Sequence, residues 1–212
     1  MKIIPLSEGS FTIDKTKLFV PFHTGEDDLQ SRPVGSLLVE VQPFVVVTAE
    51  DVLLMDTGHG FEKEGVLQIH KNLLDNGIDP GEVTKVLMTH LHKDHAGGIS
   101  QVNSNAEREP AFPNATYYVQ KQELEYAFEK GFPSYITEEL KCLKHMSNLV
   151  LLEGDGVLRG YIKYKITGAH CPYHQVFWIV DGGEKIFFGG DVAPQLQQMK
   201  SRFIAKYDYD GK

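Results

Sequence analysis

The stretch HLHKDH, at residues 90–95, carries three histidines and one aspartate within six positions. Alternate side chains of an extended segment point to the same face, so we expect His90, His92 and Asp94 to face together. His95 would then come from a turn just beyond, and the Gly-Gly pair that follows supplies the backbone freedom for that turn. Because imidazoles and a carboxylate suit a borderline-soft divalent ion such as Zn²⁺, this stretch predicts a metal site.

Four segments share one pattern, in which an apolar strand runs directly into a polar loop. They are VLLMDTG (52–58), KVLMTHLHKDH (85–95), YKITGAH (164–170) and KIFFGGD (185–191). Functional side chains often lie on loops that a rigid sheet holds in place. These loops contain most of the His and Asp residues that could bind a metal, so we expect them to meet at one site.

The remaining pattern predicts a mixture of strands and helices that is rich in sheet. Strands are expected at 11–20, 36–41, 44–48, 52–55, 85–89, 116–119, 149–152, 161–167, 176–180 and 185–188. Helices are expected at 65–76, 121–129 and 137–146, the first of which ends at an Asn-Gly stop signal. This mixture indicates an α/β or α+β fold, and the pairing order of the strands does not follow from the pattern.

The four loops together resemble the signature of the metallo-β-lactamase superfamily. Residues 90–95 are similar to its His-x-His-x-Asp-His motif, and three further matches follow in the family's order. These are Asp56-Thr57-Gly58, Gly168-Ala169-His170 with His174 four residues on, and Gly189-Gly190-Asp191. The resemblance implies an α/β fold built as a four-layer αβ/βα sandwich of two mixed sheets with helices outside, in a single domain over residues 1–212.

The resemblance also implies two divalent metal ions at the edge where the loops meet. The residues that would hold them are His90, His92 and His170 for the first ion, Asp94 and His95 for the second, and Asp191 as a bridge between the two. Zn²⁺ is the expected ion, and Mn²⁺ or Fe would also suit this mixture of ligands.

Three residues would have roles in the chemistry or its support. A water or hydroxide between the metals would be the nucleophile, and Asp94 would pass a proton to the leaving group. Asp56 would orient a ligand loop without binding metal itself. His174 is expected to support the site rather than to bind an ion.

The sequence departs from the family at the second metal. Family members place a further His near the C-terminus, whereas no His follows His174 here, and residues 207–210 resemble the segment that leads towards it. We therefore expect a domain truncated at its C-terminus, with the C-terminal half shortened by about a helix and a strand. An apolar surface would be left uncovered, which a homodimer or a domain swap would cover.

A looser resemblance bears on the substrate. The layout of residues 110–125, in which FPNAT (112–116) runs into a strand and then a helix, looks like the lactonase branch that opens acyl-homoserine lactones and also includes organophosphate hydrolases. This implies hydrolysis of a small lactone or other ester. The alternatives are a glyoxalase II-like thioester hydrolase or a phosphoester hydrolase. The missing His favours another class, a non-catalytic metal-binding domain, whereas Asp94 favours the enzyme.

The composition and net charge limit the classes of molecule that the protein is expected to bind. The 212 residues, 42% of them hydrophobic and 24% charged, are ordinary for one globular domain. A net charge of -8 argues against a nucleic-acid backbone as partner, because such binding requires dense Lys and Arg. The N-terminus MKIIPLSEGS is no secretory signal, no apolar run reaches membrane-spanning length, and two cysteines make no disulfide framework. We expect a cytoplasmic protein that takes a small-molecule substrate.

Some of these residues also have plain structural interpretations. Asp56 begins an Asp-Thr-Gly sequence and Asp191 follows Gly-Gly, and an ordinary turn aspartate is common in both contexts. Cys171 adjoins a candidate ligand, yet a buried inert cysteine is the more common case. Four aromatics could line a substrate pocket or belong to the core: Phe128, Phe132, Tyr135 and Phe177.

Overall fold

The computed structural model describes residues 1–192, 194, 200 and 209, and its largest sheet is mixed. This first sheet has the strand order β1-β5-β6-β9-β12-β13. Its strands are β1 (Lys2–Pro5), β5 (Phe44–Val47), β6 (Val52–Met55), β9 (Lys85–Leu87), β12 (Thr116–Gln120) and β13 (Leu149–Leu152). β5 pairs antiparallel with β1 and β6, whereas β6, β9, β12 and β13 run parallel.

The second sheet is antiparallel throughout its described strands. It comprises β14 (Gly156–Leu158), β15 (Ile162–Ile166), β16 (Gln175–Asp181) and β17 (Glu184–Phe188), in that order. The expectation of a second mixed sheet is therefore wrong for this part of the chain. The physical reason is local connection: Gly182 and Gly183, both at positive φ, close a two-residue turn that can only join antiparallel neighbours.

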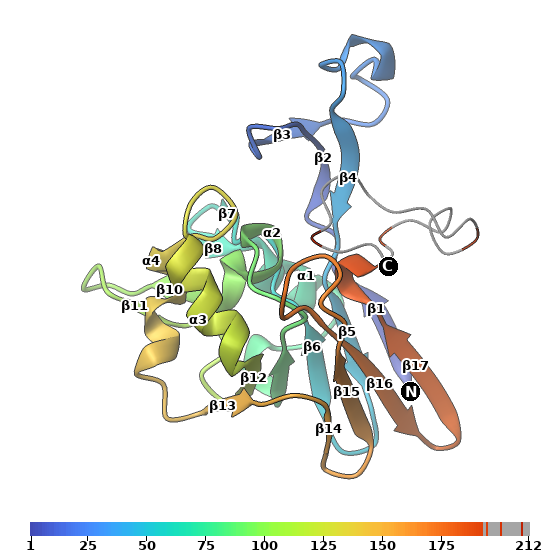
Figure 1. Cartoon of the computed structure of the whole chain (residues 1–212), viewed down its shortest axis with the longest axis vertical. Helices are drawn as coiled ribbons and strands as arrows, with labels where there is room; N and C mark the ends of the chain where they lie inside the picture. Colours follow the sequence, from blue (N-terminus) through green and yellow to red (C-terminus); the bar gives the residue numbers. More distant parts are fainter. Residues whose placement is uncertain (193, 195–199, 201–208, 210–212) are drawn as a thin grey trace.

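Helices cover the face of the first sheet that lies away from the second sheet (Figure 1). The α-helices are α1 (Gln68–Asp75), α2 (Lys93–Ala96), α3 (Lys121–Lys130) and α4 (Thr137–Leu140). Short 3-10 turns lie at η1 (Leu29–Ser31), η2 (Pro80–Glu82), η3 (Gly97–Ile99), η4 (Lys141–Lys144) and η5 (Gly190–Val192). Among the described residues, no helix has the length and apolar character needed to cross a membrane.

Two hydrophobic cores result from the alternation of side chains along the central strands. In β6, Leu54 packs with the helices, whereas Leu53 and Met55 pack with the second sheet. The helical core includes Leu73 of α1, and the core between the sheets includes Phe177 of β16. The described residues thus build three layers, one of helices and two of sheet. The expected sandwich has a fourth layer, of helices over the second sheet. The described residues do not include such helices.

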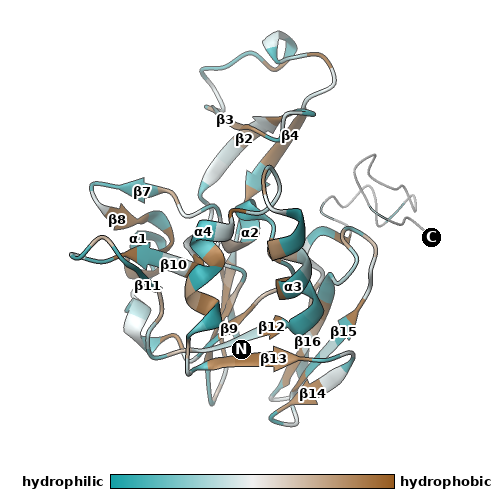
Figure 2. Cartoon of the chain, turned by 60° about the vertical axis from the view of Figure 1, so that its left-hand side comes forward, coloured by the Kyte–Doolittle hydropathy of each residue, from teal (hydrophilic) through white to brown (hydrophobic). Residues whose placement is uncertain are grey.

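A small sheet of three strands projects from the body of the molecule, at the top of Figures 1 and 2. It is formed by β2 (Gly9–Ile13), β3 (Phe19–Phe22) and β4 (Leu37–Val41), in the order β3-β2-β4. A single strand at 11–20 was the expectation, and it is wrong. The chain turns after β2, where Asp14 Oδ1 accepts a hydrogen bond from the amide of Thr16 at 2.9 Å and Lys17 adopts φ 58°.

Two predicted helices are shorter than expected, and several hairpins were not foreseen. The segment 65–76 begins with the short strand β8 (Val66–Leu67), which pairs with β7 (Glu62–Lys63), before α1 starts. The segment 137–146 divides into α4 and η4. Another unforeseen hairpin pairs β10 (Ser100–Val102) with β11 (Arg108–Pro110).

Candidate metal centre

Strand pairing brings the four predicted loops to one edge of the molecule. β6 and β9 are parallel with Met55 opposite Leu87, so both strands release their loops at the same edge. β15 and β17 both pair antiparallel with β16, so they also end together. The sheets join at this edge, because Gln175 Nε2 donates to the carbonyl of Met88 at 2.7 Å and the Gln175 amide donates to that of Thr89 at 2.9 Å.

Three imidazoles converge to form the first group of candidate ligands. His92 Nδ1 lies 3.1 Å from His90 Nε2 and 3.0 Å from His170 Nε2. Ring nitrogens bound tetrahedrally to one Zn²⁺ stand about 3.3 Å apart, given Zn–N bonds of about 2.0–2.1 Å. The spacing therefore fits three ligands of a single ion.

A second group combines His90, His95 and Asp191. Asp191 Oδ1 lies 3.3 Å from His95 Nε2, and Asp191 Oδ2 lies 3.5 Å from His170 Nε2. One carboxylate thus faces a histidine from each proposed metal site, which is the placement that a bridging ligand requires. Asp94 belongs to neither group, although its Oδ2 lies 3.7 Å from His95 Nε2.

The expectation of an extended HLHKDH segment holds for only part of its length, because α2 begins within it. His92 caps the N-terminus of α2 with φ -60° and ψ 149°, and Asp94 lies in the first turn of that helix. Leu91 points into the helical core and is fully buried, as alternation predicted. Asp94 therefore reaches the site from a helical turn beside His95 rather than from the face of a strand.

The Gly-Gly pair after the motif has a different purpose from the predicted one. Gly97 has φ -60°, which any residue adopts. A β-carbon on Gly97 would instead collide with the carbonyl of His59, and one on Gly98 with the carbonyl of Thr57. The glycines therefore allow the turn after the motif to pack directly against the Asp-Thr-Gly loop.

Asp56 is buried and ties two of the loops together. Its Oδ1 accepts a hydrogen bond from the Thr89 amide at 2.7 Å, and its Oδ2 accepts one from the Thr89 hydroxyl at 2.8 Å. Asp56 Oδ2 also lies 2.9 Å from His95 Nδ1. This contact fixes the ring so that Nε2 faces Asp191, as in the carboxylate–histidine–metal arrangements of metal centres. The orienting role that the resemblance implies for Asp56 remains a prediction.

His174 is fully buried and holds the loop of Asp191. Its Nε2 accepts a hydrogen bond from the Asp191 amide at 3.1 Å, and its Nδ1 lies 3.1 Å from the Thr167 hydroxyl. Burial lowers the pKa of His174 to about 3, so the ring stays neutral and able to accept. Gly190 leaves the room for this contact, since a β-carbon there would press on both His174 and Thr89.

The charges at the site suit a divalent cation. Burial, reinforced by the neighbouring imidazoles, lowers the pKa values of His90 and His92, so their nitrogen lone pairs are available. Burial opposes ionisation of Asp191, but His95 and His170 hold its pKa well below the usual range. Burial also opposes protonation of His95, but Asp191 and Asp94 raise its pKa well above the usual value. These carboxylates therefore favour positive charge at this point of the site, which a divalent metal ion would supply.

Sequence reasoning missed two side chains that organise the site, Thr89 and Glu123. Thr89 contacts both Asp56 and His90, whose Nδ1 lies 3.0 Å from its hydroxyl. Glu123 is buried on α3 beside the core residues Leu124 and Ala127. An acid on the apolar face of a predicted helix is the signal that could have identified it.

Of the four aromatic residues predicted to line a pocket or belong to the core, one packs against the histidine cluster and the others lie elsewhere. The ring of Tyr135 is buried 4.8 Å from that of His92, whereas Phe177 lies in the core between the sheets and Phe132 is exposed. Cys171 is buried, and burial raises the pKa of its thiol, which agrees with an inert cysteine. His59, for which no role was predicted, stacks on Phe61 at 4.2 Å.

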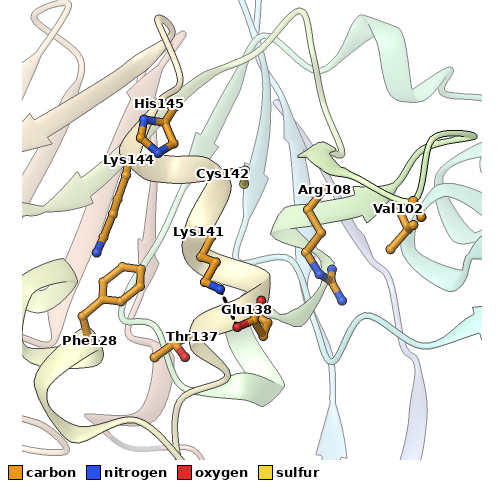
Figure 3. A pocket seen from close by; sticks show the side chains of 10 residues that line it. Val102, Arg108, Phe128, Thr137, Glu138, Lys141, Cys142, Lys144 and His145 are labelled. Atoms are coloured by element: carbon orange, nitrogen blue, oxygen red, sulfur yellow. Dashed lines mark hydrogen bonds and ion pairs between the residues drawn. The ribbon is translucent and has the colours of Figure 1, made fainter.

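A surface cavity of about 720 Å³ contains none of the candidate ligands (Figure 3). It lies along α4 and η4, opposite Arg108 of β11, and its lining includes an ion pair of 2.6 Å between Lys141 Nζ and Glu138 Oε1. Phe128, one of the predicted pocket aromatics, lines this cavity rather than the histidine cluster. We therefore place the candidate chemistry at the sheet edge.

Known proteins share this sequence pattern. A family model described as "Metallo-beta-lactamase superfamily" matches residues 39–210. N-acyl homoserine lactonase AttM of Azorhizobium caulinodans is 45% identical over 129 residues, which are 56% of this chain and 43% of that protein. AttM of Agrobacterium fabrum is 46% identical over 114 residues, which are 49% and 38% of the two chains. The match therefore spans less than half the length of these curated relatives.

Solved structures share the fold. The chain resembles a probable metal-dependent hydrolase from Staphylococcus aureus with a TM-score of 0.74 at 21% identity, covering 99% of this chain and 79% of that one. It resembles AidC, a dizinc quorum-quenching lactonase in complex with a product, with a TM-score of 0.68 at 21% identity, covering 90% and 71%. At this identity the likeness concerns the fold alone, and it confirms the predicted fold class in a chain shorter than its neighbours.

Proposed function

Because the chain belongs to the metallo-beta-lactamase superfamily, we propose that it is a metal-dependent hydrolase that opens a small lactone or another ester. The observation that carries this proposal is the convergence of two groups of candidate metal ligands at one edge of the sheets. The relatives named N-acyl homoserine lactonase supply the substrate class, a homoserine lactone with an acyl chain.

The proposed cofactor is a pair of divalent ions, of which Zn²⁺ is the first candidate and Mn²⁺ or Fe the alternatives. His90, His92 and His170 would hold one ion, Asp94 and His95 the other, and Asp191 would contact both. When bound, such ions polarise a substrate carbonyl and bring the pKa of a coordinated water towards neutrality.

Asp94 is the residue proposed to move the proton. Its side chain is 25% exposed and lies beside His95, so a substrate at the site can reach it. Water adds to the lactone carbonyl and loses a proton to Asp94, and the ring C–O bond breaks. Asp94 then returns the proton to the leaving oxygen, which yields a hydroxy acid. Asp56 and His174 keep His95 and Asp191 in the orientation that this step requires.

The test is turnover of N-hexanoyl-homoserine lactone by protein loaded with Zn²⁺ or Mn²⁺. Ring opening yields an acid, so a pH indicator reports the rate directly. We expect turnover by the wild type and its loss in His92→Ala, which removes a nitrogen shared by two short contacts. His145→Ala is the matched control, because this histidine lies at the end of η4 outside the cluster.

Other substrates decide between the remaining functions. Turnover of a thioester or a phosphotriester in place of the lactone would reassign the substrate but not the site. Metal-loaded protein that hydrolyses none of these bonds would favour the non-catalytic metal-binding domain.

We also propose that the physiological partners are small molecules and a second copy of the chain. The net charge of -8 disfavours a nucleic-acid backbone. Val157, Val180 and Phe187 of the second sheet are 59%, 45% and 49% exposed, and a homodimer would cover them. Light scattering measures the assembly: we expect a dimer that Phe187→Glu dissociates, and a monomeric wild type would contradict it.

A further inference from the structure

A carboxylate from α3 contacts two of the three loops that carry the candidate ligands. The Glu123 side chain belongs to a residue only 1% exposed. Its Oε1 accepts a hydrogen bond from the amide of Leu91 at 3.0 Å, and Leu91 lies between two candidate ligands in the sequence. Its Oε2 accepts a hydrogen bond from the thiol of Cys171, the residue after a third candidate ligand, at 3.4 Å. One side chain therefore joins loops from the two sheets.

The same carboxylate also fixes a ring that packs on a candidate ligand. The Tyr135 hydroxyl donates a hydrogen bond to Glu123 Oε1 at 3.3 Å. The ring centroid of Tyr135 lies 4.8 Å from that of His92. His92 is thereby restrained twice, through the backbone beside it and through the ring against it.

The placement of Glu123 is unusual for an acid. A buried carboxylate is unfavourable unless its oxygens are hydrogen-bonded. The three donors that the described residues supply come from three separate segments around the histidine cluster, none of which is α3. A buried, fully hydrogen-bonded carboxylate rigidifies the segments that supply its donors. Here Leu91 and Cys171 belong to the candidate ligand loops.

We propose that Glu123 is a positioning residue of the metal centre. It acts through the Leu91 amide and the Cys171 thiol to hold the two loops at the separation that lets His92 and His170 share one ion. The proposal rests on the proposed metal-dependent function, and Glu123 itself does not touch the ion.

Two substitutions of equal size separate hydrogen bonding from charge. Glu123→Gln removes the charge but keeps a carbonyl that can accept from Leu91 and an amide N–H that can donate to the Cys171 sulfur, whereas Glu123→Met removes both of these hydrogen-bonding groups. The dissociation constant for Zn²⁺ is measured on metal-free protein by competition with a chromogenic chelator. We expect Glu123→Gln to bind as the wild type does and Glu123→Met to bind about 10- to 100-fold more weakly, the usual cost of losing such support.

A spectroscopic measurement shows whether the geometry of the site changes as well. Co²⁺ substituted into the site reports its ligand geometry through visible absorption. The spectrum of Glu123→Gln should match that of the wild type, and the spectrum of Glu123→Met should differ. Leu124→Ala is the control for general damage to α3, because this neighbour packs in the core and contacts neither loop through a hydrogen bond. It should lower the unfolding temperature and leave the metal affinity unchanged.

The outcomes are distinct. Equal affinity and equal spectra for Glu123→Met and Glu123→Gln would overturn the positioning role. A wild type that binds no ion would overturn the metal centre itself, and with it this role. If Glu123→Met fails to fold, Cys171→Ala decides: it removes only the bond to the His170 loop, so weaker binding supports the proposal and unchanged binding overturns it.

Discussion

Asp94 has the only carboxylate in the HLHKDH segment, and its side chain is 25% exposed beside His95. We predict that Asp94→Asn lowers kcat for lactone hydrolysis about 10²- to 10⁴-fold, the usual contribution of a positioned proton-transfer group. The variant should still bind an ion at His90, His92 and His170. Steady-state kinetics together with metal analysis test this, and Asp79→Asn, at the residue that caps η2 away from the site, is the control. A variant as fast as the wild type would show that the assigned proton path is wrong.

Glu8 makes stability depend on pH. Burial raises its pKa from 4.5 to about 7; Oε2 accepts the His59 amide at 2.5 Å, and Oε1 has no partner among the described residues. Between these values the folded protein keeps a proton that the unfolded chain has released, so stability falls as pH rises through this range.

We therefore predict that Glu8→Gln stabilises the metal-free protein at pH 8. The gain should be at most about 3 kcal/mol, because each unit of pKa shift corresponds to about 1.4 kcal/mol. The gain should shrink towards zero as pH falls to 4.5. Urea unfolding of both proteins at pH 5 and pH 8 measures it, and an equal difference at both pH values would contradict the explanation.

At the scale of residues, the sequence predicted what lies in short motifs. The histidines of HLHKDH identify themselves because their spacing is local, and Asp56, His170 and Asp191 follow from the resemblance. The sequence did not predict a role for Glu123, because its hydrogen bonds are to residues 32 and 48 positions away in the chain. The ligand roles themselves remain predictions until metal content is measured.

The turn after α2 depends on two glycines that have no room for a side chain. We predict that Gly98→Ala destabilises the protein by about 1–3 kcal/mol, since the added carbon meets the backbone carbonyl of Thr57, which cannot move alone. Metal affinity should fall as well, because the Asp56 loop is displaced. Gly81→Ala is the control: its nearest neighbour is the end of the Asp79 side chain, which can rotate away. Thermal unfolding compares the two, and equal effects would refute the close-packing argument.

At the scale of elements, short apolar runs bounded by polar residues were the most reliable signal. β6 and β13 have the predicted bounds, because both are short apolar runs bounded by polar residues. The errors occur where local polar contacts end an element early. An Asp14 turn divides the predicted strand at 11–20, and the predicted helix at 137–146 tightens into a 3-10 turn after Leu140.

Metal should stabilise the whole molecule as well as equip the site. We expect elemental analysis of protein purified without chelator to give about two equivalents of divalent metal per chain, one for each group of candidate ligands. Removing the metal should lower the unfolding temperature by about 5–10 °C if it is present at about a hundred times its dissociation constant.

The number of equivalents decides how much of the site is formed. About one equivalent would mean that only the histidine group is complete. The absence of metal after soaking with Zn²⁺ and Mn²⁺ would contradict the ligand assignment of His90, His92 and His170.

At the scale of the molecule, the sequence could not predict how the strands pair. The order β1-β5-β6-β9-β12-β13 of the first sheet depends on contacts between segments that are distant in the sequence. Only the family resemblance supplied the layered architecture, which the solved neighbours confirm. Hydrophobic periodicity states which face of a strand is buried, but not which strand lies beside it.

The junction between the two sheets also has a consequence for the order of folding. Gln175 and Met88 are 87 positions apart, and the paired rings of His92 and His170 are 78 apart. Contacts between such distant positions carry a large loop-closure cost, so they form slowly compared with hairpins and helices. A chain emerging from denaturant should therefore regain its helical signal before it can take up metal. The lag between the two signals would time the closing of the sheets.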